Sequence, residues 1–113
     1  MQVTVSLIGT ALIVKLNGEI DHHSSKTIKE TIDNEYSAQN AKNIIIDFTN
    51  VSFMDSSGIG MIMGRYKKLV PRGEIKIFGV NDNIKRIFDI SGLHKIITIH
   101  ESLQAATGGA YVR

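Results

Sequence analysis

The sequence predicts an α/β fold: a mostly parallel mixed sheet with one antiparallel edge strand, and helices between the other strands. Short apolar segments typical of strands alternate with longer amphipathic segments typical of helices, which favours parallel strands joined by helical crossovers. The first two strand-like segments have only a short turn between them, so we expect an antiparallel pair. The expected element order is ββαβαβαβα. A chain of 113 residues can build one hydrophobic core, which indicates a single domain over residues 1–113.

The predicted hairpin occupies the start of the chain. Apolar and polar residues alternate over residues 3–7, as in a strand with one buried face. Gly9-Thr10 favours a turn, and residues 11–16 are predicted to form the second strand. We expect Asn17-Gly18 to end this strand, because this dipeptide is typical of turns.

The first helix is predicted to begin at Asp21, whose carboxylate can accept hydrogen bonds from the unpaired N–H groups of the first turn. Ile28, Ile32 and Tyr36 follow at helical spacing and define the face expected to lie against the sheet. Residues 38–43 are mostly polar, and we expect them to connect this helix to the next strand.

A central strand is predicted at residues 42–48, because its continuous apolar centre is typical of a strand buried on both faces. Residues 49–55 are expected to form a loop before a second helix, which begins at Ser56 and ends before Pro71. The inward face of this helix is predicted to carry Ile59, Ile62, Met63, Tyr66, Leu69 and Val70.

The last third of the chain is predicted to contain two more strands and two more helices. Asn81 or Asp82 can cap the third helix, and Gly92 stands where a left-handed residue commonly ends a helix. The predicted elements are a strand at 74–78, a helix between Asn81 and Gly92, a strand at 96–99 and a short helix at 102–106. Residues 108–113 are expected to form a tail without an inferred function.

Composition and charge exclude several classes of protein. Hydrophobic residues make up 42% of the chain and charged residues 21%, which is typical of a folded domain. The net charge is only +2, so neither nucleic acid nor a membrane surface is expected as a partner. The basic cluster Arg65, Lys67, Lys68 and Arg72 is predicted to be a solvated helix face.

The chain also carries no sign of export or of a membrane anchor. It has no cysteine, so neither a disulfide nor a thiol nucleophile is available. Apolar runs such as residues 44–46 fall far short of the roughly 20 residues that span a bilayer. The N-terminus lacks the charged start and apolar block of a signal peptide, and we therefore expect a cytoplasmic protein.

The spacing of the histidines and glycines does not match known metal-binding or nucleotide-binding motifs. His22 and His23 are adjacent, so on a helix their side chains diverge by roughly 100°, and no metal site is expected. The glycines of residues 58–64 follow GxGxxxG and fall inside a helix, unlike a dinucleotide fingerprint. Gly60 and Gly64 share one helix face, and each lowers helix stability by up to about 1 kcal/mol relative to alanine. Close packing of this helix on the sheet is predicted to compensate.

A serine hydrolase is an alternative that the sequence does not favour. A nucleophile elbow places glycine two residues before the serine, and Met54 stands there instead. No acid and histidine follow in the order that a catalytic triad needs. We therefore do not expect an enzyme, and we expect no cofactor.

The start of the second helix is the candidate functional site. Asp55-Ser56-Ser57-Gly58 places a carboxylate and two hydroxyls at one exposed helix N-terminus. Unpaired N–H groups and the helix dipole favour negative charge there, including the charge of about −1.5 to −2 on a phosphoserine. Phosphorylation is therefore expected to leave the fold intact and to change the surface that a partner meets.

Three segments together resemble a known family. Residues 51–67, with the run Phe53-Met54-Asp55-Ser56-Ser57-Gly58, are similar to the signature of bacterial anti-sigma factor antagonists, which belong to the STAS-domain family. Residues 18–23 and 85–93 resemble two further landmarks of this family. The resemblance covers nearly the whole chain, and it implies a single STAS domain with the element order given above.

The resemblance implies a switch in which the unphosphorylated protein binds an anti-sigma factor that is also a serine kinase. Binding frees the sporulation sigma factor F, the kinase uses ATP to phosphorylate Ser56, and a serine phosphatase restores the protein. The residues implied at the partner contact are Asp21, Asp55, Ser56, Ser57, Gly58 and Ile59. Two alternatives stay open: a small-molecule or nucleotide-binding module, and an antagonist of a general-stress anti-sigma factor.

Overall fold

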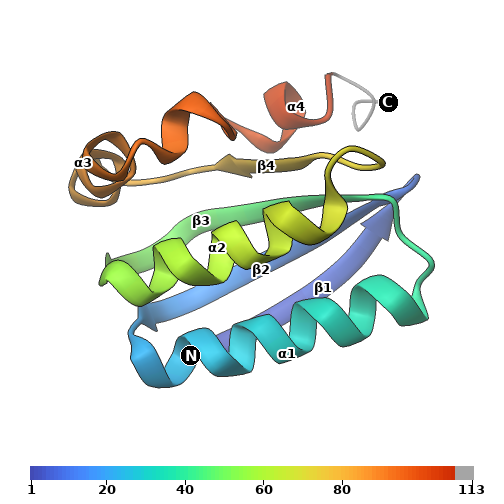
Figure 1. Ribbon diagram of the computed structural model, residues 1–113, viewed down its shortest axis with the longest axis horizontal. Coiled ribbons are helices and arrows are strands. Elements are labelled where there is room, and N and C mark those ends of the chain that lie inside the picture. The colour runs from blue at the N-terminus through green and yellow to red at the C-terminus, as the bar shows by residue number, and fades with distance from the viewer. Residues whose placement is uncertain (109–113) are drawn as a thin grey trace.

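The computed structural model describes residues 1–108, and one five-stranded sheet organises them. The helices α1, α2 and α3 cover one face of the sheet, and the short α4 lies on the other (Figure 1). The elements are β1 (Gln2–Ile8), β2 (Ala11–Ile20), α1 (His22–Ala38), β3 (Asn43–Met54), α2 (Ser56–Leu69), β4 (Ile75–Phe78), α3 (Asp82–Ser91), the 3₁₀ helix η1 (Leu93–Lys95), β5 (Thr98–His100) and α4 (Leu103–Ala106).

The strand order in the sheet is β1-β2-β3-β4-β5. The pair β1–β2 is antiparallel, and the other three pairs are parallel. This arrangement confirms the predicted fold class and the predicted order ββαβαβαβα. Because β2, β3, β4 and β5 all run in the same direction, their carboxyl ends lie at the same edge of the sheet.

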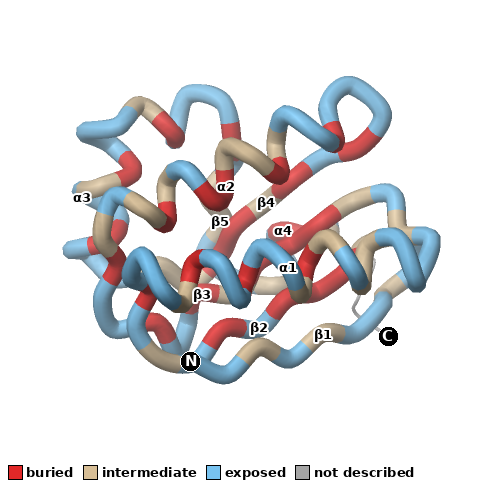
Figure 2. Tube along the Cα trace, turned by 60° about the horizontal axis from the view of Figure 1, so that its bottom comes forward, coloured by how far each residue is buried: buried red, intermediate tan, exposed pale blue. Residues whose placement is uncertain are grey.

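The main core lies between the sheet and helices α1 to α3, as the buried segments of Figure 2 show. Alternate residues of β2 and β3 point into it, and Phe48 packs edge-on against Phe88 of α3, with ring centroids 5.6 Å apart. A smaller cluster on the opposite face joins Ile13, Ile45 and Phe78 to Ala106 of α4. The helix predicted at 102–106 therefore covers the second face of the sheet.

The strands β2 and β3 extend several residues beyond their predicted ends. β2 does not end at Asn17-Gly18 but continues to Ile20 through two irregularities in its pairing with β3, and Gly18 adopts a positive φ of 132° there. The predicted loop at 49–55 is also wrong, because β3 runs to Met54. Local turn signals were overridden here by pairing between the two strands.

The ends of the helices agree more closely with the prediction. Asp21 and Asp55 cap α1 and α2, and Asn81 rather than Asp82 caps α3. Gly92 ends α3 in the left-handed region, at φ 80°. The last strand is shorter than predicted, because residues 96–97 follow η1 and precede β5. Residues 109–113 of the expected tail lie outside the described part of the chain.

Candidate functional site

The N-termini of α1 and α2 lie side by side at the carboxyl edge of the sheet. Ile20 pairs with Met54 as the last residue pair of β2 and β3, so Asp21 and Asp55 follow directly from neighbouring strands. The backbone N–H of Asp55 donates to the carbonyl oxygen of Ile20 at 3.0 Å, which ties the two chain segments together. Ligands of open α/β sheets commonly bind outside this edge.

Asp21 forms a capping box with Ser24 at the start of α1. Its carboxylate accepts from the Ser24 backbone N–H at 2.8 Å, and its own N–H donates to the Ser24 hydroxyl at 2.9 Å. These hydrogen bonds hold the pKa of the Asp21 carboxyl below its usual value, the backbone N–H of Ser24 being the largest cause. Asp21 is exposed, so a carboxylate stands in contact with solvent at this end of the site.

Ser57 is held by partners on both sides. The Asp55 carboxylate accepts from the Ser57 backbone N–H at 2.9 Å and also from the Ser57 hydroxyl. The Ser57 hydroxyl oxygen lies 3.0 Å from the hydroxyl oxygen of Ser25, which is buried on α1. Ser57 therefore joins the N-terminus of α2 to α1.

Ser56 differs from its neighbour in both exposure and bonding. It is exposed at the first position of α2, and its hydroxyl forms no hydrogen bond with the described residues. Its Oγ is therefore available to react from solvent, whereas the Oγ of Ser57 is already shared between Asp55 and Ser25.

Gly58 is buried directly behind the two serines. A Cβ at this position would lie 2.5 Å from Cγ and Sδ of Met54 and 3.2 Å from a methyl group of Ile20. The glycine thus permits the close approach of α2 to the ends of β2 and β3. Ile59, the last of the residues predicted at the partner contact, is half-buried against the core.

Phe53 is a surface residue of this region that the sequence patterns did not predict. It is 51% exposed, although it is a large aromatic side chain only two residues before Asp55. Because residues 49–55 were expected to be a loop, no face was assigned to this side chain. Its place in β3, beside Glu19 of β2, leaves it at the same edge of the sheet as the two helix N-termini.

Arg65 does not lie on the solvated basic face that was predicted for α2. It is only 3% exposed, and its Nε lies 2.8 Å from Oδ1 of Asp33 on α1, in an ion pair without an aligned hydrogen bond. Its Nη1 donates to the carbonyl oxygen of Met61 at 3.3 Å. The sequence contained a signal for this, because Arg65 follows Met61 by four residues and precedes Leu69 by four, on the face that α2 buries.

The buried face of α2 coincides in part with the predicted one, since Ile62 and Leu69 are buried and Ile59, Met63 and Tyr66 are half-buried against the core. It consists of Gly58, Met61, Ile62, Arg65 and Leu69. Gly60 and Gly64 do not pack closely on the sheet as predicted, since a Cβ at either position would meet no atom of another element of residues 1–108 within 4 Å. Val70, which was expected to face inward, is 41% exposed at the end of the helix.

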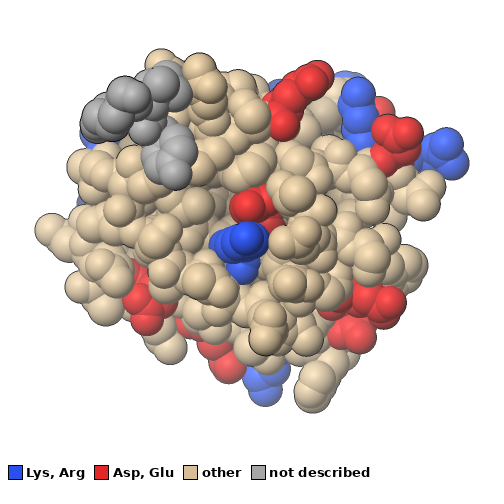
Figure 3. Space-filling model, turned by 180° about the vertical axis from the view of Figure 1, so that it is seen from behind, with Lys and Arg blue, Asp and Glu red and all other residues tan. Residues whose placement is uncertain are grey.

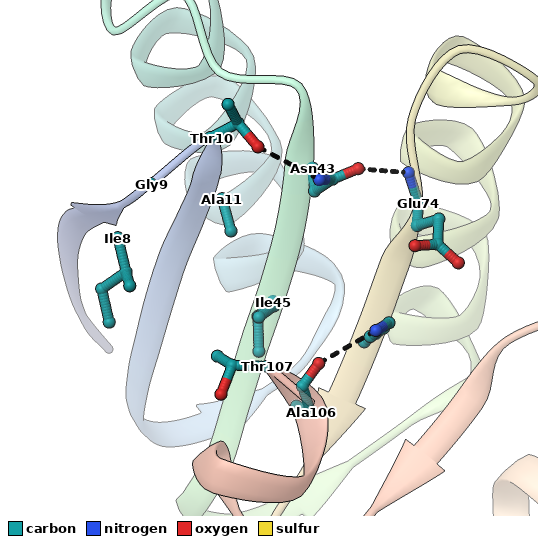
Figure 4. Close-up of a pocket in the computed structure, with 10 residues that line it drawn as sticks. Ile8, Gly9, Thr10, Ala11, Asn43, Ile45, Glu74, Ala106 and Thr107 are labelled. Carbon is teal, nitrogen blue, oxygen red and sulfur yellow. Dashed lines mark hydrogen bonds between the residues drawn. The ribbon is translucent and has the colours of Figure 1, made fainter. Parts of the chain in front are cut away.

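A cavity of about 310 Å³ on the other face of the sheet is not part of this site. It lies at the amino end of β3, beside the turn between β1 and β2 and against α4 (Figure 4). Asn43 spans it, with its side chain accepting from Glu74 N at 2.9 Å and donating to Thr10 Oγ1 at 3.4 Å. These hydrogen bonds connect neighbouring elements of the fold. Residues 1–108 contain no group of three His, Cys, Asp or Glu side chains that could hold a metal ion.

Comparisons with known proteins agree with the fold. Residues 2–106 match the family model of the STAS domain. The chain therefore belongs to the STAS-domain family, among its anti-sigma factor antagonists. Proteins of this class are regulatory proteins and not enzymes. The part of the chain from residue 1 to 108 contains no helix long and apolar enough to cross a membrane.

Three relatives illustrate the similarity. An anti-sigma F factor antagonist from Paenibacillus polymyxa is 40% identical over 92 residues, which cover 80% of this chain and 79% of the relative. An anti-sigma-B factor antagonist from Listeria monocytogenes is 40% identical over 83 residues, which cover 73% and 72%. The solved structure of the Bacillus cell fate determinant SpoIIAA in its phosphorylated form superposes with a TM-score of 0.72 at 25% identity, and covers 95% of this chain and 98% of that one.

Proposed function

We propose that this protein is a phosphorylation-gated switch whose unphosphorylated form binds an anti-sigma factor that is also a serine kinase. The observation that carries the proposal is the difference between the two neighbouring serines. Ser56 offers an exposed hydroxyl without a hydrogen-bond partner among the described residues, and Ser57 is engaged by Asp55 and Ser25. A kinase that docks at this edge therefore finds one free acceptor.

In the proposed reaction the Ser56 Oγ attacks the γ-phosphorus of ATP held by the partner. The Oγ–P bond forms, the bond from that phosphorus to the ADP oxygen breaks, and the hydroxyl proton passes to a base of the kinase. A separate serine phosphatase returns the hydroxyl by hydrolysis. The catalytic groups belong to the partners, and Ser56 is the substrate.

Charge at the paired helix N-termini explains how the phosphate ends binding. Phosphoserine adds a charge of about −1.5 to −2 at Ser56, next to the Asp55 carboxylate and close to the end of β2 that leads to Asp21. In an interface this charge would be buried beside two carboxylates and the phosphates of the nucleotide. A thousandfold loss of affinity requires only about 4 kcal/mol, which an uncompensated buried dianion can supply.

We further propose that the contact surface comprises Asp21, Asp55, Ser56, Ser57, Gly58 and Ile59, with Gly58 acting through the packing beneath it. The exposed Phe53 extends this surface with an apolar side chain. The sigma factor released is proposed to be the sporulation factor F, acting in the cytoplasm. Support comes from the Paenibacillus antagonist, which is 40% identical over 92 residues. The sigma-B antagonists match at 40% over only 83 residues in Listeria, or over 92 residues at only 33% in Staphylococcus aureus.

The test combines the protein with anti-sigma factor kinases encoded in its own genome, in the presence of ATP or ADP. Intact mass measurement should show one added phosphate on Ser56 with ATP, and size-exclusion chromatography should show a stable complex with ADP. A complex with a general-stress kinase alone would reassign the sigma factor. The absence of both complex and phosphate with every such kinase would reject the switch.

A further inference from the structure

An open groove of about 690 Å³ runs along the outer surface between α1 and α2, the two helices that lie side by side in Figure 1. One end of the groove reaches Ser57, next to the proposed phosphorylation site, and the other reaches Arg65. On α1 the groove is lined by four side chains that are basic or titratable, namely His22, His23, Lys26 and Lys29. On α2 it is lined in part by Gly60 and Gly64.

The two glycines leave the backbone of α2 bare along the groove. Neither has a positive φ, and a Cβ at Gly60 or Gly64 would meet no atom of another element within 4 Å in the described part of the chain. The fold therefore does not require glycine at these positions. Alanine would make the helix more stable, so the two glycines have no explanation within the fold itself. A physical reason for glycine here is that, without a Cβ, the backbone of α2 can be approached closely by a chain of another protein.

The charge along the groove has one sign. No Asp or Glu among the described residues lines it, and Lys26 and Lys29 are exposed and form no ion pair within residues 1–108. Asp33, the nearby carboxylate of α1, is paired with Arg65 and Lys68. On the opposite face of the molecule, positive and negative side chains are interspersed (Figure 3).

We propose that this groove binds an acidic segment of a protein partner, with carboxylates against Lys26 and Lys29 and the backbone of the segment against Gly60 and Gly64. The identity of the partner rests on the proposed function, in which a kinase engages Ser56 at the end of the groove. A protein segment is favoured over a small anion because the groove is open along its length. A small ligand there would stay largely in water.

Charge reversal with a matched control tests the groove. The variant Lys26→Glu/Lys29→Glu should bind the ADP-loaded kinase at least tenfold more weakly than the wild type, measured by titration calorimetry at 50 and 300 mM salt. The control Lys15→Glu/Lys95→Glu makes the same change in net charge at exposed positions outside the groove. An equal loss in both variants, or no loss in either, would overturn the proposal.

A second variant separates binding from folding. Gly64→Ala should raise the melting temperature, because alanine favours the helix and finds free space. The same variant should weaken kinase binding severalfold, because the methyl group narrows the groove. Unchanged affinity in this more stable variant would contradict the proposed contact with the glycine backbone.

A probe without the kinase keeps this test independent of the proposed function. A hexaglutamate peptide, titrated into ¹⁵N-labelled protein, should shift amide resonances of residues 22–29 and 60–65, and Lys26→Glu/Lys29→Glu should abolish these shifts. No shifts, shifts elsewhere, or equal shifts with inorganic phosphate would overturn the proposal. If the peptide binds the groove but no kinase binds the protein, the proposed function is rejected, whereas the proposal that the groove binds an acidic segment is retained.

Discussion

The hydroxyl oxygens of Ser25 and Ser57 lie 3.0 Å apart, although 32 positions separate the two residues in the sequence. Ser25 is buried on α1, and Ser57 occupies the first turn of α2. Since the Ser57 hydroxyl also donates to Asp55, one hydrogen-bonded chain links the cap of α2 to the neighbouring helix. This chain distinguishes Ser57 from Ser56 in the folded protein.

The Ser25–Ser57 bond should contribute measurably to stability. Ser25→Ala and Ser57→Ala should each lower the free energy of unfolding, and a double-mutant cycle should give a coupling of about 0.5–1.5 kcal/mol, as for a typical intramolecular hydrogen bond. Urea denaturation of the four proteins measures it. Strictly additive effects would mean that the two hydroxyls do not interact in solution.

Substitution at Ser56 should separate binding from release. Ser56→Ala should bind the kinase in ADP as the wild type does, and it should stay bound when ATP is added, because no acceptor hydroxyl remains. Ser56→Asp should bind more weakly, because it adds a charge beside Asp55. Ser57→Ala is the matched control and should still gain one phosphate, as intact mass measurement can show. Tight binding by Ser56→Asp would argue against a charge mechanism.

The glycines of α2 should respond to alanine in opposite directions. Gly58→Ala should lower the free energy of unfolding by about 1–3 kcal/mol, because the new methyl group overlaps the buried Met54 side chain. Gly60→Ala meets free space and should raise it, by up to about 1 kcal/mol. Thermal and urea denaturation compare the two. A stabilised Gly58→Ala protein would show that Met54 moves aside without cost.

Removal of the partner of Arg65 should destabilise the protein. Asp33→Asn should lower the free energy of unfolding by about 1–3 kcal/mol, because the buried guanidinium loses its countercharge. Lys68 pairs with the same carboxylate from an exposed position, so Lys68→Ala should change stability by less than about 0.5 kcal/mol. Equal effects of the two substitutions in urea denaturation would refute a special role for Arg65.

His100 should make stability depend on pH. Burial of this side chain, and secondarily the charge of Lys76, hold the pKa of His100 below its usual value of 6.5. Above this value the imidazole is neutral in both states, and stability is unaffected. As the pH falls through 6.5, the unfolded chain takes up the proton first, so stability decreases until the folded pKa is reached.

Urea denaturation between pH 8 and pH 5 measures this decrease. His100→Gln should show a smaller decrease than the wild type over this interval, because its side chain cannot bind the proton. His94→Gln, at a histidine that is exposed beside Asp89, is the control and should keep the slope caused by His100. An unchanged slope in His100→Gln would assign the pH dependence to other groups.

Local patterns were sufficient for much of the fold. Alternation and helical spacing predicted the α-helices and strands of residues 1–108 in the correct order, although not the 3₁₀ helix η1. Capping residues such as Asp21 and Gly92 marked helix ends. The errors in the ends of β2 and β3 lie where pairing between segments overrides local signals. Asn17-Gly18 is typical of a turn, yet β2 passes through it because β3 provides backbone partners as far as Met54.

The sequence by itself determined the element order, the capping residues and the cluster Asp55-Ser56-Ser57, because each depends on residues within a few positions of one another. Tertiary structure alone decided which side chains meet across the helices. Ser25 reaches Ser57, and Asp33 reaches Arg65, only because Ile20 pairs with Met54 and sets α1 beside α2. Strand register and helix packing join segments more than thirty residues apart, and no local pattern encodes that distance or orientation.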